Sequence, residues 1–248
     1  MSDLKLARPT SFHQFLKQWL SQRWPWVLTL LLGVLIPLQI FLILAFEIWR
    51  HQDGFQWDIS TLEQVHKFAN PTLDVFVTTF THFGTAWGVF PASALISIAL
   101  LLYRRWRSLT YFLVTVLGCG LINHTAKVFL HRDRPSLWAY PETQGFSFPS
   151  GHAMSSMVLV AALVVLSWKT SWRWRTLSLG SIFVVAIGWT RLYLGVHYPS
   201  DILAGWMVAL AWAVGMSLIV RPHFHPPHLL NTPPEILEDE MEDSLLKN

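Results

Sequence analysis

The sequence predicts an all-α, polytopic membrane protein with six transmembrane helices. Of its 248 residues, 52% are hydrophobic and only 13% are charged, a composition typical of membrane proteins. Long apolar runs alternate with short loops that hold most of the lysines and arginines. The 14 tryptophans fit aromatic belts at the two faces of a bilayer. The formal net charge of +3 is small and shows no basic patch for nucleic acid, so nucleic acid is not an expected partner.

The first expected span covers residues 26–46. It follows a mildly basic N-terminal segment, residues 1–25, which we expect to be cytoplasmic. The apolar run is too long for a signal-peptide core and lacks a small-residue cleavage site, so the sequence predicts a retained helix. Pro37 lies inside this span and should kink it, which neighbouring helices tolerate.

A mixed loop, residues 47–84, separates the first span from the second. Broken apolar spacing over residues 59–68 and 73–83 predicts short amphipathic helices at the membrane interface. The second span covers residues 87–103. It ends at the arginine-rich segment 104–107.

Four further apolar runs complete the membrane domain, which we expect to occupy residues 26–220. These four spans cover residues 109–127, 153–168, 177–190 and 202–220. The single cysteine, Cys119, lies inside an apolar run, which excludes an intrachain disulfide and a thiolate metal site. Residues 221–248 contain four prolines and an acidic run, so we expect a flexible acidic C-terminal tail.

Loop charges predict the orientation of the spans. The N-terminus and the loops at 104–107 and 169–175 carry the excess of lysine and arginine, which the positive-inside rule places in the cytoplasm. Both termini are then cytoplasmic. The loops that face outward are 47–84, 128–151 and 191–201. Arginines in the last two loops run against the rule, so they are candidates for function.

The first outer cluster is KVFLHRDRP, which runs from Lys127 to Pro135. Lys127 and Arg134 are seven residues apart and would share a helix face if the helix continued that far. Pro135 disfavours this and predicts a helix end near Arg134. Taken alone, the cluster fits a snorkelling lysine and a solvated arginine, with Asp133 as a partner for Arg132 or Arg134.

The second outer cluster is FPSGH, directly before the fourth span. Ser150 or Pro149 can start a helix, and Gly151 lets the backbone approach a ligand closely. A helix N-terminus offers free N–H groups and the positive end of the helix dipole, which together bind anions. His152 would stand beside such an anion. Taken alone, the cluster is equally compatible with a plain helix start beside an interfacial histidine.

The third outer cluster is TRLYLGVHYPSD, which lies between two long apolar segments. Polar groups next to a bilayer are costly, so Arg191, His197 and Asp201 need a reason to be there. A histidine can attack phosphorus, a carboxylate can orient it, and an arginine can hold phosphate oxygens. Alone, the cluster is compatible with an interfacial histidine, an ion pair and a helix-dipole partner.

All three clusters lie at the outer ends of spans, and together they supply cations, a hydroxyl, helix-end amides, two histidines and a carboxylate. The set resembles the three signatures of the type 2 phosphatidic acid phosphatase family, also called lipid phosphate phosphatases. The family patterns are Lys-x6-Arg-Pro, Pro-Ser-Gly-His and Ser-Arg-x5-His-x3-Asp, and every spacing holds here. Thr190 replaces the family serine and keeps its hydroxyl. The resemblance covers roughly residues 60–220 and includes the six-span layout.

The resemblance implies a mechanism for this chain. His197 would attack phosphorus and form a phosphohistidine, Asp201 would orient and stabilise it, and His152 would protonate the leaving oxygen and later activate water. The residues that the resemblance assigns to the phosphoryl oxygens are Lys127, Arg134, Ser150, Gly151 and Arg191. No metal or other cofactor is implied, and no carboxylate cluster suited to magnesium is evident near the site.

We therefore expect an integral-membrane phosphatase that hydrolyses a phosphomonoester or diphosphate of a lipid at the outer face of the cell (inner) membrane. Expected partners are membrane lipids and a lipid phosphate substrate such as phosphatidic acid, phosphatidylglycerophosphate or undecaprenyl diphosphate. The alternatives are a sugar-phosphate phosphatase of the same superfamily and a non-catalytic scaffold or transporter. The complete set of site residues argues against the last. The sequence ranks no lipid above another and predicts no oligomeric state.

Overall fold

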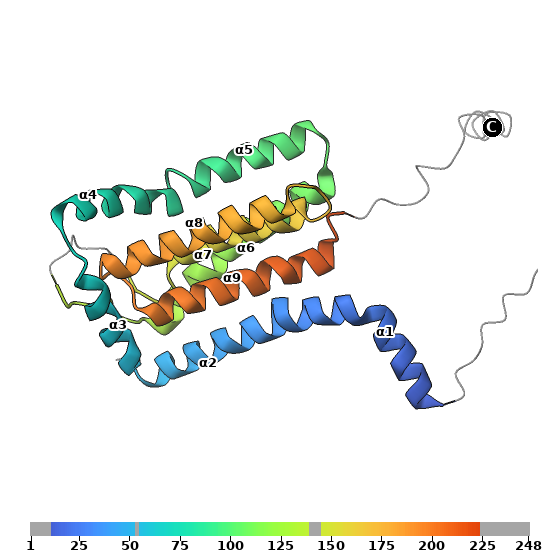
Figure 1. Ribbon diagram of the computed structural model, residues 1–248, viewed down its shortest axis with the longest axis horizontal. Coiled ribbons are helices and arrows are strands. Elements are labelled where there is room, and N and C mark those ends of the chain that lie inside the picture. The colour runs from blue at the N-terminus through green and yellow to red at the C-terminus, as the bar shows by residue number, and fades with distance from the viewer. Residues whose placement is uncertain (1–10, 53–54, 139–144, 224–248) are drawn as a thin grey trace, which may run out of the picture.

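The computed structural model describes residues 11–52, 55–138 and 145–223, and all regular structure in these ranges is helical. Most of these helices run lengthwise in one bundle (Figure 1). The predicted tail, residues 221–248, lies outside the described residues from 224 onward. Residues 1–10 of the predicted N-terminal segment also lie outside them.

The first pass through the bundle consists of α1 (Phe12–Leu30), the π-helical turn η1 (Leu31–Leu35) and α2 (Ile36–Arg50). Pro37 lies in the first turn of α2, directly after η1. Proline lacks an N–H and its ring clashes with the carbonyl four residues earlier, so a wider π turn before it relieves both problems. The sequence predicted a kink at Pro37, and the helix accommodates this proline through the π turn. Further back along the chain, α1 bends away from the bundle (Figure 1).

The second pass begins at the left-hand end of the bundle in Figure 1, where α3 (Gln56–His66) lies across that end. It continues through α4 (Pro71–Phe80), the 3₁₀ turn η2 (Thr81–Gly84) and α5 (Val89–Leu102). The two short helices predicted in the first outer loop correspond to α3 and α4. The second of them belongs to a longer apolar segment, because Pro71–Leu102 together is long and apolar enough to cross a membrane.

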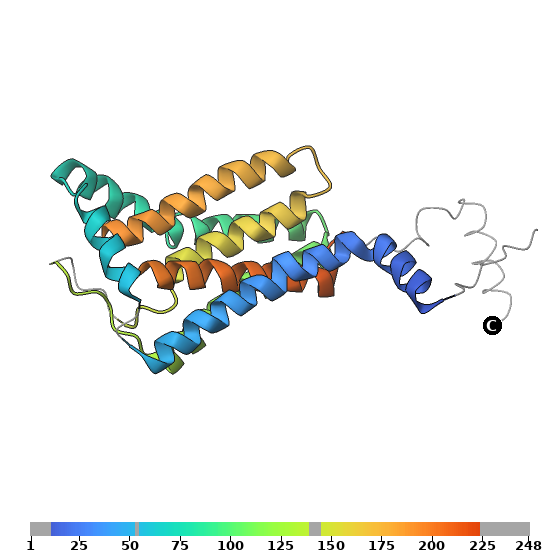
Figure 2. The same cartoon turned by 60° about the horizontal axis from the view of Figure 1, so that its bottom comes forward.

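Four more helices complete the bundle: α6 (Trp106–Leu130), α7 (Gly151–Ser167), α8 (Arg173–Tyr193) and α9 (Pro199–Val220). Within the described chain, five segments are long and apolar enough to cross a membrane, and α7 is a shorter apolar helix. Counting α7, the chain passes along the bundle six times, in agreement with the predicted spans. The helix α7 packs against α6, α8 and α9, and α2 packs along α9 (Figure 2).

The helix ends at the left of Figure 1 carry the predicted site. The end of α6, the start of α7, the end of α8 and the start of α9 all meet there, and α3 lies beside them. Phe148, just before α7, is fully buried and stacks on Phe41 of α2 with ring centroids 6.0 Å apart. The arginine-rich turn after α5 and the turn after α7 lie at the opposite end.

Candidate active site

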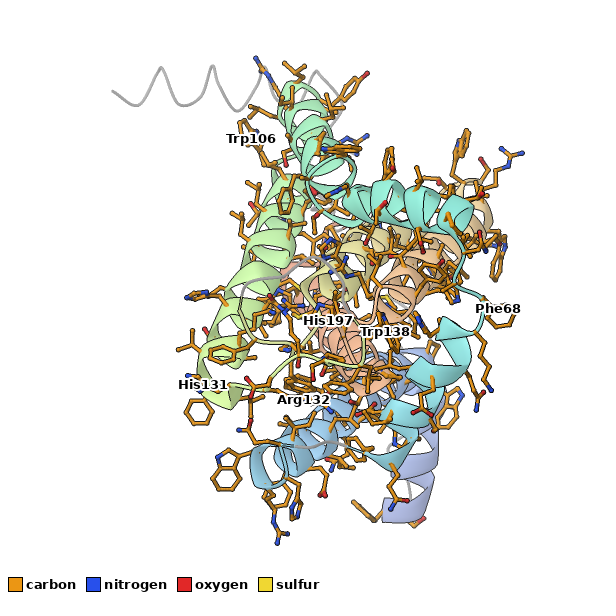
Figure 3. The ribbon with its side chains drawn as sticks, turned by 90° about the vertical axis from the view of Figure 1, so that its left-hand side faces the viewer. Phe68, Trp106, His131, Arg132, Trp138 and His197 are labelled. Carbon is orange, nitrogen blue, oxygen red and sulfur yellow. The ribbon has the colours of Figure 1, made fainter. Side chains whose placement is uncertain are left out.

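His197 lies in the turn between α8 and α9, and its side chain is buried. Figure 3 looks onto this end of the bundle and shows His197 near its middle, whereas His131 lies at its edge. Asp201, in the first turn of α9, is also buried, and its Oδ2 accepts the N–H of Tyr198 at 2.9 Å. This capping interaction fixes the carboxylate relative to the backbone that carries His197.

The two ring nitrogens of His197 face different partners. Nδ1 lies 3.5 Å from Asp201 Oδ2, and Nε2 lies 3.3 Å from Arg134 Nη1. The Nδ1 contact is longer than a usual hydrogen bond. Because a guanidinium group only donates, Nε2 must present its lone pair to Arg134, so the ring proton is on Nδ1 and faces Asp201. This is the tautomer that an attacking histidine requires.

Burial holds the pKa of His197 well below its ordinary value, and the charges of Arg191, Arg134 and Lys127 lower it further. Both effects disfavour a second positive charge in a site that already holds three cations. The imidazole is therefore neutral at neutral pH. A neutral ring with its lone pair directed at cations can act as a nucleophile toward an anionic group.

Arg134 joins the segment before α7 to the turn that carries His197. Its Nε donates to the carbonyl of Gly145 at 2.8 Å, and its Nη1 donates to the carbonyl of Val196 at 2.9 Å. Lys127, in the last turn of α6, donates to the carbonyl of Phe146. Burial lowers the pKa of Arg134 from its high ordinary value, but a guanidinium stays charged near neutral pH. The helix α6 ends at Leu130, so Arg134 reaches the site from non-helical backbone.

Arg191 lies in the last turn of α8 and is 5% exposed. Its Nη1 donates to the hydroxyl of Thr81 at 2.8 Å, and Thr190 also donates to that hydroxyl at 3.0 Å. The hydroxyl that Thr190 shares with the family serine therefore helps to hold Thr81 in place. The Nε of Arg191 is buried without a hydrogen-bond partner within the described chain, which leaves a donor for an anion.

The start of α7 brings the second cluster to the same place. The N–H of Ser150 donates to the backbone carbonyl of Asp201 at 3.1 Å, so the second and third clusters are joined directly. The Ser150 hydroxyl is buried and has no partner among the described residues. Gly151 is the first residue of α7, and His152 follows it with Nε2 3.4 Å from the hydroxyl of Thr85. The structure thus gathers all eight predicted site residues at one end of the bundle.

Residues of the turn η2 and the residue after it contact side chains of the site. Nothing in the sequence singled them out. Thr81 holds Arg191, Thr85 lies beside His152, and the carbonyl of Gly84 accepts the Ser155 hydroxyl at 2.6 Å. A Cβ on Gly84 would lie 2.7 Å from a side-chain carbon of Ile187 and 3.2 Å from Cδ2 of His152. Only glycine therefore lets this turn approach so closely.

Arg132 is the second feature that the sequence did not single out. Its side chain is fully buried and forms ion pairs with Asp201 at 2.6 Å and with Asp58 of α3 at 2.8 Å. The sequence offered the adjacent Asp133 as a partner for Arg132 or Arg134, but these two more distant carboxylates are the ones that Arg132 contacts. Within the described ranges, no group of three or more His, Cys, Asp or Glu side chains is placed to hold a metal ion.

A family model for the PAP2 superfamily matches residues 108–224. Phosphatidylglycerophosphatase B of Bacillus subtilis (strain 168) is 31% identical over 181 residues, which is 68% of this chain and 86% of that protein. The chain belongs to the PAP2 superfamily. An undecaprenyl-diphosphatase of Sulfolobus acidocaldarius is 28% identical over 197 residues, which cover 75% of this chain and 90% of that PAP2 relative.

The PAP2 fold is also found in a solved structure. The crystal structure of a transmembrane PAP2-type phosphatidylglycerolphosphate phosphatase from Bacillus subtilis superposes with a TM-score of 0.66 at 24% identity, covering 76% of this chain and 98% of that one. The apolar helices and the PAP2 relatives together establish an integral membrane protein of a lipid phosphatase family. The family and the fold class predicted from the sequence are thus confirmed.

Proposed function

We propose that this protein is a lipid phosphate phosphatase that hydrolyses a lipid phosphomonoester or diphosphate through a phosphohistidine intermediate on His197. One observation carries the proposal: the buried, neutral imidazole presents Nε2 to a cation and Nδ1 to the carboxylate of Asp201. Such an arrangement suits attack on an electron-rich phosphoryl group, because the cations withdraw charge from the group while the carboxylate stabilises the imidazolium that forms.

In the first step, the Nε2 lone pair of His197 forms a bond to phosphorus as the bond from phosphorus to the leaving oxygen breaks. The electron pair of the broken bond stays on the leaving oxygen, which takes a proton from His152. Asp201 stabilises the positive charge that develops on His197. In the second step, a water molecule attacks the phosphohistidine, His152 takes the proton of that water, and the phosphorus–nitrogen bond breaks.

The phosphoryl oxygens would be held without a metal ion. Lys127, Arg134 and Arg191 supply three positive charges, and the last of these keeps an unpaired buried donor. The Ser150 hydroxyl and the N–H of Gly151 at the start of α7 add neutral donors. Positioned cations and amides of this kind stabilise the charge of a phosphoryl transition state.

A lipid substrate is favoured by where the site lies. It is built at one end of a bundle whose helices expose apolar side chains along their length, so a lipid in the bilayer meets the site at headgroup level. Relatives named for phosphatidylglycerophosphate and undecaprenyl diphosphate suggest these two substrates, with phosphatidic acid as a third. The basic turns at the opposite end support cytoplasmic termini and a site on the outer side of the cell membrane.

Phosphate release from purified protein in detergent tests this function. We expect turnover of at least one of the three lipids in the presence of a chelator, and no turnover of water-soluble sugar phosphates. Activity that a chelator abolishes and magnesium restores would contradict the metal-independent mechanism. Hydrolysis of sugar phosphates alone would favour the other enzyme class.

The orientation in the membrane is tested with single cysteines that replace Leu137 or Ser171 in a chain without Cys119. A membrane-impermeant thiol reagent added from outside should label the cysteine at position 137 and not the one at position 171.

A further inference from the structure

A chain of buried charges joins α3 to the active site. Asp58, Arg132 and Asp201 come from α3, from the segment after α6 and from α9, and all three side chains are fully buried. Figure 3 shows Arg132 and His197 at the same end of the bundle. The mechanism above uses only Asp201 of these three residues.

The two carboxylate oxygens of Asp201 contact different groups. Oδ1 accepts Nη1 of Arg132 at 2.6 Å. Oδ2 accepts the N–H of Tyr198 at 2.9 Å and faces Nδ1 of His197 at 3.5 Å. The guanidinium of Arg132 also lies flat over the ring of Tyr198, 3.9 Å from its centroid. A carboxylate held at both oxygens cannot rotate away from the imidazole.

Asp58 holds Arg132 and the first turn of α9 at once. Its Oδ2 accepts Nη2 of Arg132 at 2.8 Å and the hydroxyl of Ser200 at 2.6 Å, and its Oδ1 accepts the N–H of Ser200 at 2.9 Å. The same Ser200 hydroxyl accepts Nη1 of Arg132 at 2.8 Å. The planar fork of an arginine directs separate N–H groups at two carboxylates, a geometry that the compact ammonium of a lysine does not reproduce.

The charges in this cluster do not cancel. Two carboxylates and one guanidinium leave a net charge of −1 beside His197. If Asp58 were neutral, Arg132 would be paired with Asp201 alone and would cancel the negative potential that Asp201 presents to the imidazole. A buried ion-pair network is weak evidence for stability because desolvation offsets its attraction. Orientation and net charge at the nucleophile therefore explain this cluster better than stability does.

We propose that Asp58 and Arg132 are positioning residues, which hold the Asp201 carboxylate against His197 and keep the cluster negative so that the attacking imidazole is stabilised. The proposal rests on the proposed function, because it takes His197 as the nucleophile. It assigns a catalytic support role to α3, which otherwise lies outside the family's three signatures.

Asp58→Asn is the sharpest test, because it keeps the shape of the side chain and removes its charge. We expect kcat to fall roughly 10- to 100-fold, by analogy with the hydrogen-bonding partners that orient metal-bound histidines, with little change in KM. The reason is that the lost stabilisation exists only in the transition state. Arg132→Lys should also lower kcat, because the compact ammonium does not reproduce the fork that contacts both carboxylates. Asp58→Asn keeps Arg132 paired with Asp201 and so avoids leaving it unpaired.

Asp74→Asn is the matched control. Asp74 lies on α4 in the same part of the chain, and its Oδ1 accepts the hydroxyl of Tyr193 at 2.7 Å. We expect kcat to change by less than about twofold, within the range of a weakened neutral hydrogen bond away from the site. A drop in thermal stability with unchanged kcat in Asp58→Asn would show a merely structural role and overturn the proposal.

Nitrogen-15 NMR of histidine-labelled protein tests the same idea without turnover. The Nδ1 signals of His197, assigned by their loss in His197→Gln, should move in Asp58→Asn and stay in place in Asp74→Asn. Signals of His152 should stay in place in both. The charged or titratable groups that face His197 are Lys127 from α6, Arg134 from the following segment, His152 from α7, Arg191 from α8 and Asp201 from α9.

The two measurements separate two kinds of failure. If wild-type protein releases no phosphate from any lipid phosphate, the proposed function fails, whereas the NMR result still decides whether Asp58 acts on His197. Unchanged His197 signals in Asp58→Asn overturn the positioning proposal even where the phosphatase activity is confirmed. Equal shifts of His197 and His152 would indicate a general structural disturbance and would also overturn it.

Discussion

The active site draws on two regions of the chain that differ in kind. Residues 127–201 supply the side chains that we assign to the reaction, whereas residues 58–85 supply side chains that contact these and hold them. The first region places its polar groups at fixed spacings, because neighbouring helix ends must bring them to one phosphoryl group. The second region places Asp58, Thr81 and Thr85 on short helices and turns, where no fixed spacing relates them to each other. Residues that act on the substrate can therefore be recognised from their spacing in the sequence. Residues that hold them in place have no such spacing and are hard to recognise.

Among the variants that compare the two regions, His152→Ala should lose the most activity. His152→Ala removes the group that protonates the leaving oxygen, so we expect turnover of lipid phosphates to fall roughly 10²- to 10⁴-fold. An aryl phosphate such as p-nitrophenyl phosphate needs little protonation on departure, so its hydrolysis should fall much less if it enters the site. Parallel kcat measurements on both substrates check this. Equal losses on both would remove His152 from the role of general acid.

Thr81 should show the smaller effect expected of a supporting residue. Thr81→Ala removes the hydroxyl that accepts from Arg191, so that cation loses its fixed position. A hydrogen bond to a charged group contributes about 1.5–3 kcal/mol, so kcat/KM should fall roughly 10-fold or more. Thr81→Ser should restore most of the activity because it keeps the acceptor. Equal activity in both variants would show that Thr81 does not position Arg191.

The pH dependence of activity tests whether nearby cations keep His197 neutral. Because the pKa of His197 lies well below its ordinary value, lowering the pH from 7 to 6 should leave its reactive neutral form intact. An ordinary histidine of pKa about 6.5 would lose neutral form about threefold over that range. Lys127→Met removes a cation that lowers the pKa of His197, so the acid limb of kcat/KM should move to higher pH.

Thr190→Ser is the matched control for that profile, because it removes no charge and leaves in place the Thr81 hydroxyl that holds Arg191. Its acid limb should stay where the wild-type limb lies, after correction for ionisation of the substrate. A limb that moves in Thr190→Ser and stays fixed in Lys127→Met would contradict the electrostatic account of His197.

The smallest expected effect is at Thr190, where this chain departs from the family pattern. Thr190→Ser keeps the hydroxyl that hydrogen-bonds with the Thr81 hydroxyl at 3.0 Å and lies 2.6 Å from the carbonyl of Ile187. We therefore expect kcat/KM within about twofold of wild type, since no hydrogen bond to a charged group is lost. Thr190→Val, which lacks the hydroxyl, should resemble Thr81→Ala. A large gain in Thr190→Ser would mean that the extra methyl group strains the site.

Most of the fold and the polar core of the site were predictable from the sequence. Apolar runs are set by the bilayer, so they mark the spans whatever the helices pack against. The extent of the second pass was less clear, because α4 and α5 join through a 3₁₀ turn that interrupts the apolar run. For Arg132 the sequence suggested only the adjacent Asp133 as a partner, and its actual partners were not predictable because Asp58 lies 74 residues away.

The central claim is that His197 carries the phosphoryl group, and trapping that group tests it most directly. Wild-type protein is mixed with radiolabelled substrate, quenched rapidly without acid, and separated from free label. We expect label on wild-type protein that is stable to base and released by acid, and no label on His197→Ala. Label trapped on His197→Ala as on wild type would show that another residue is the nucleophile.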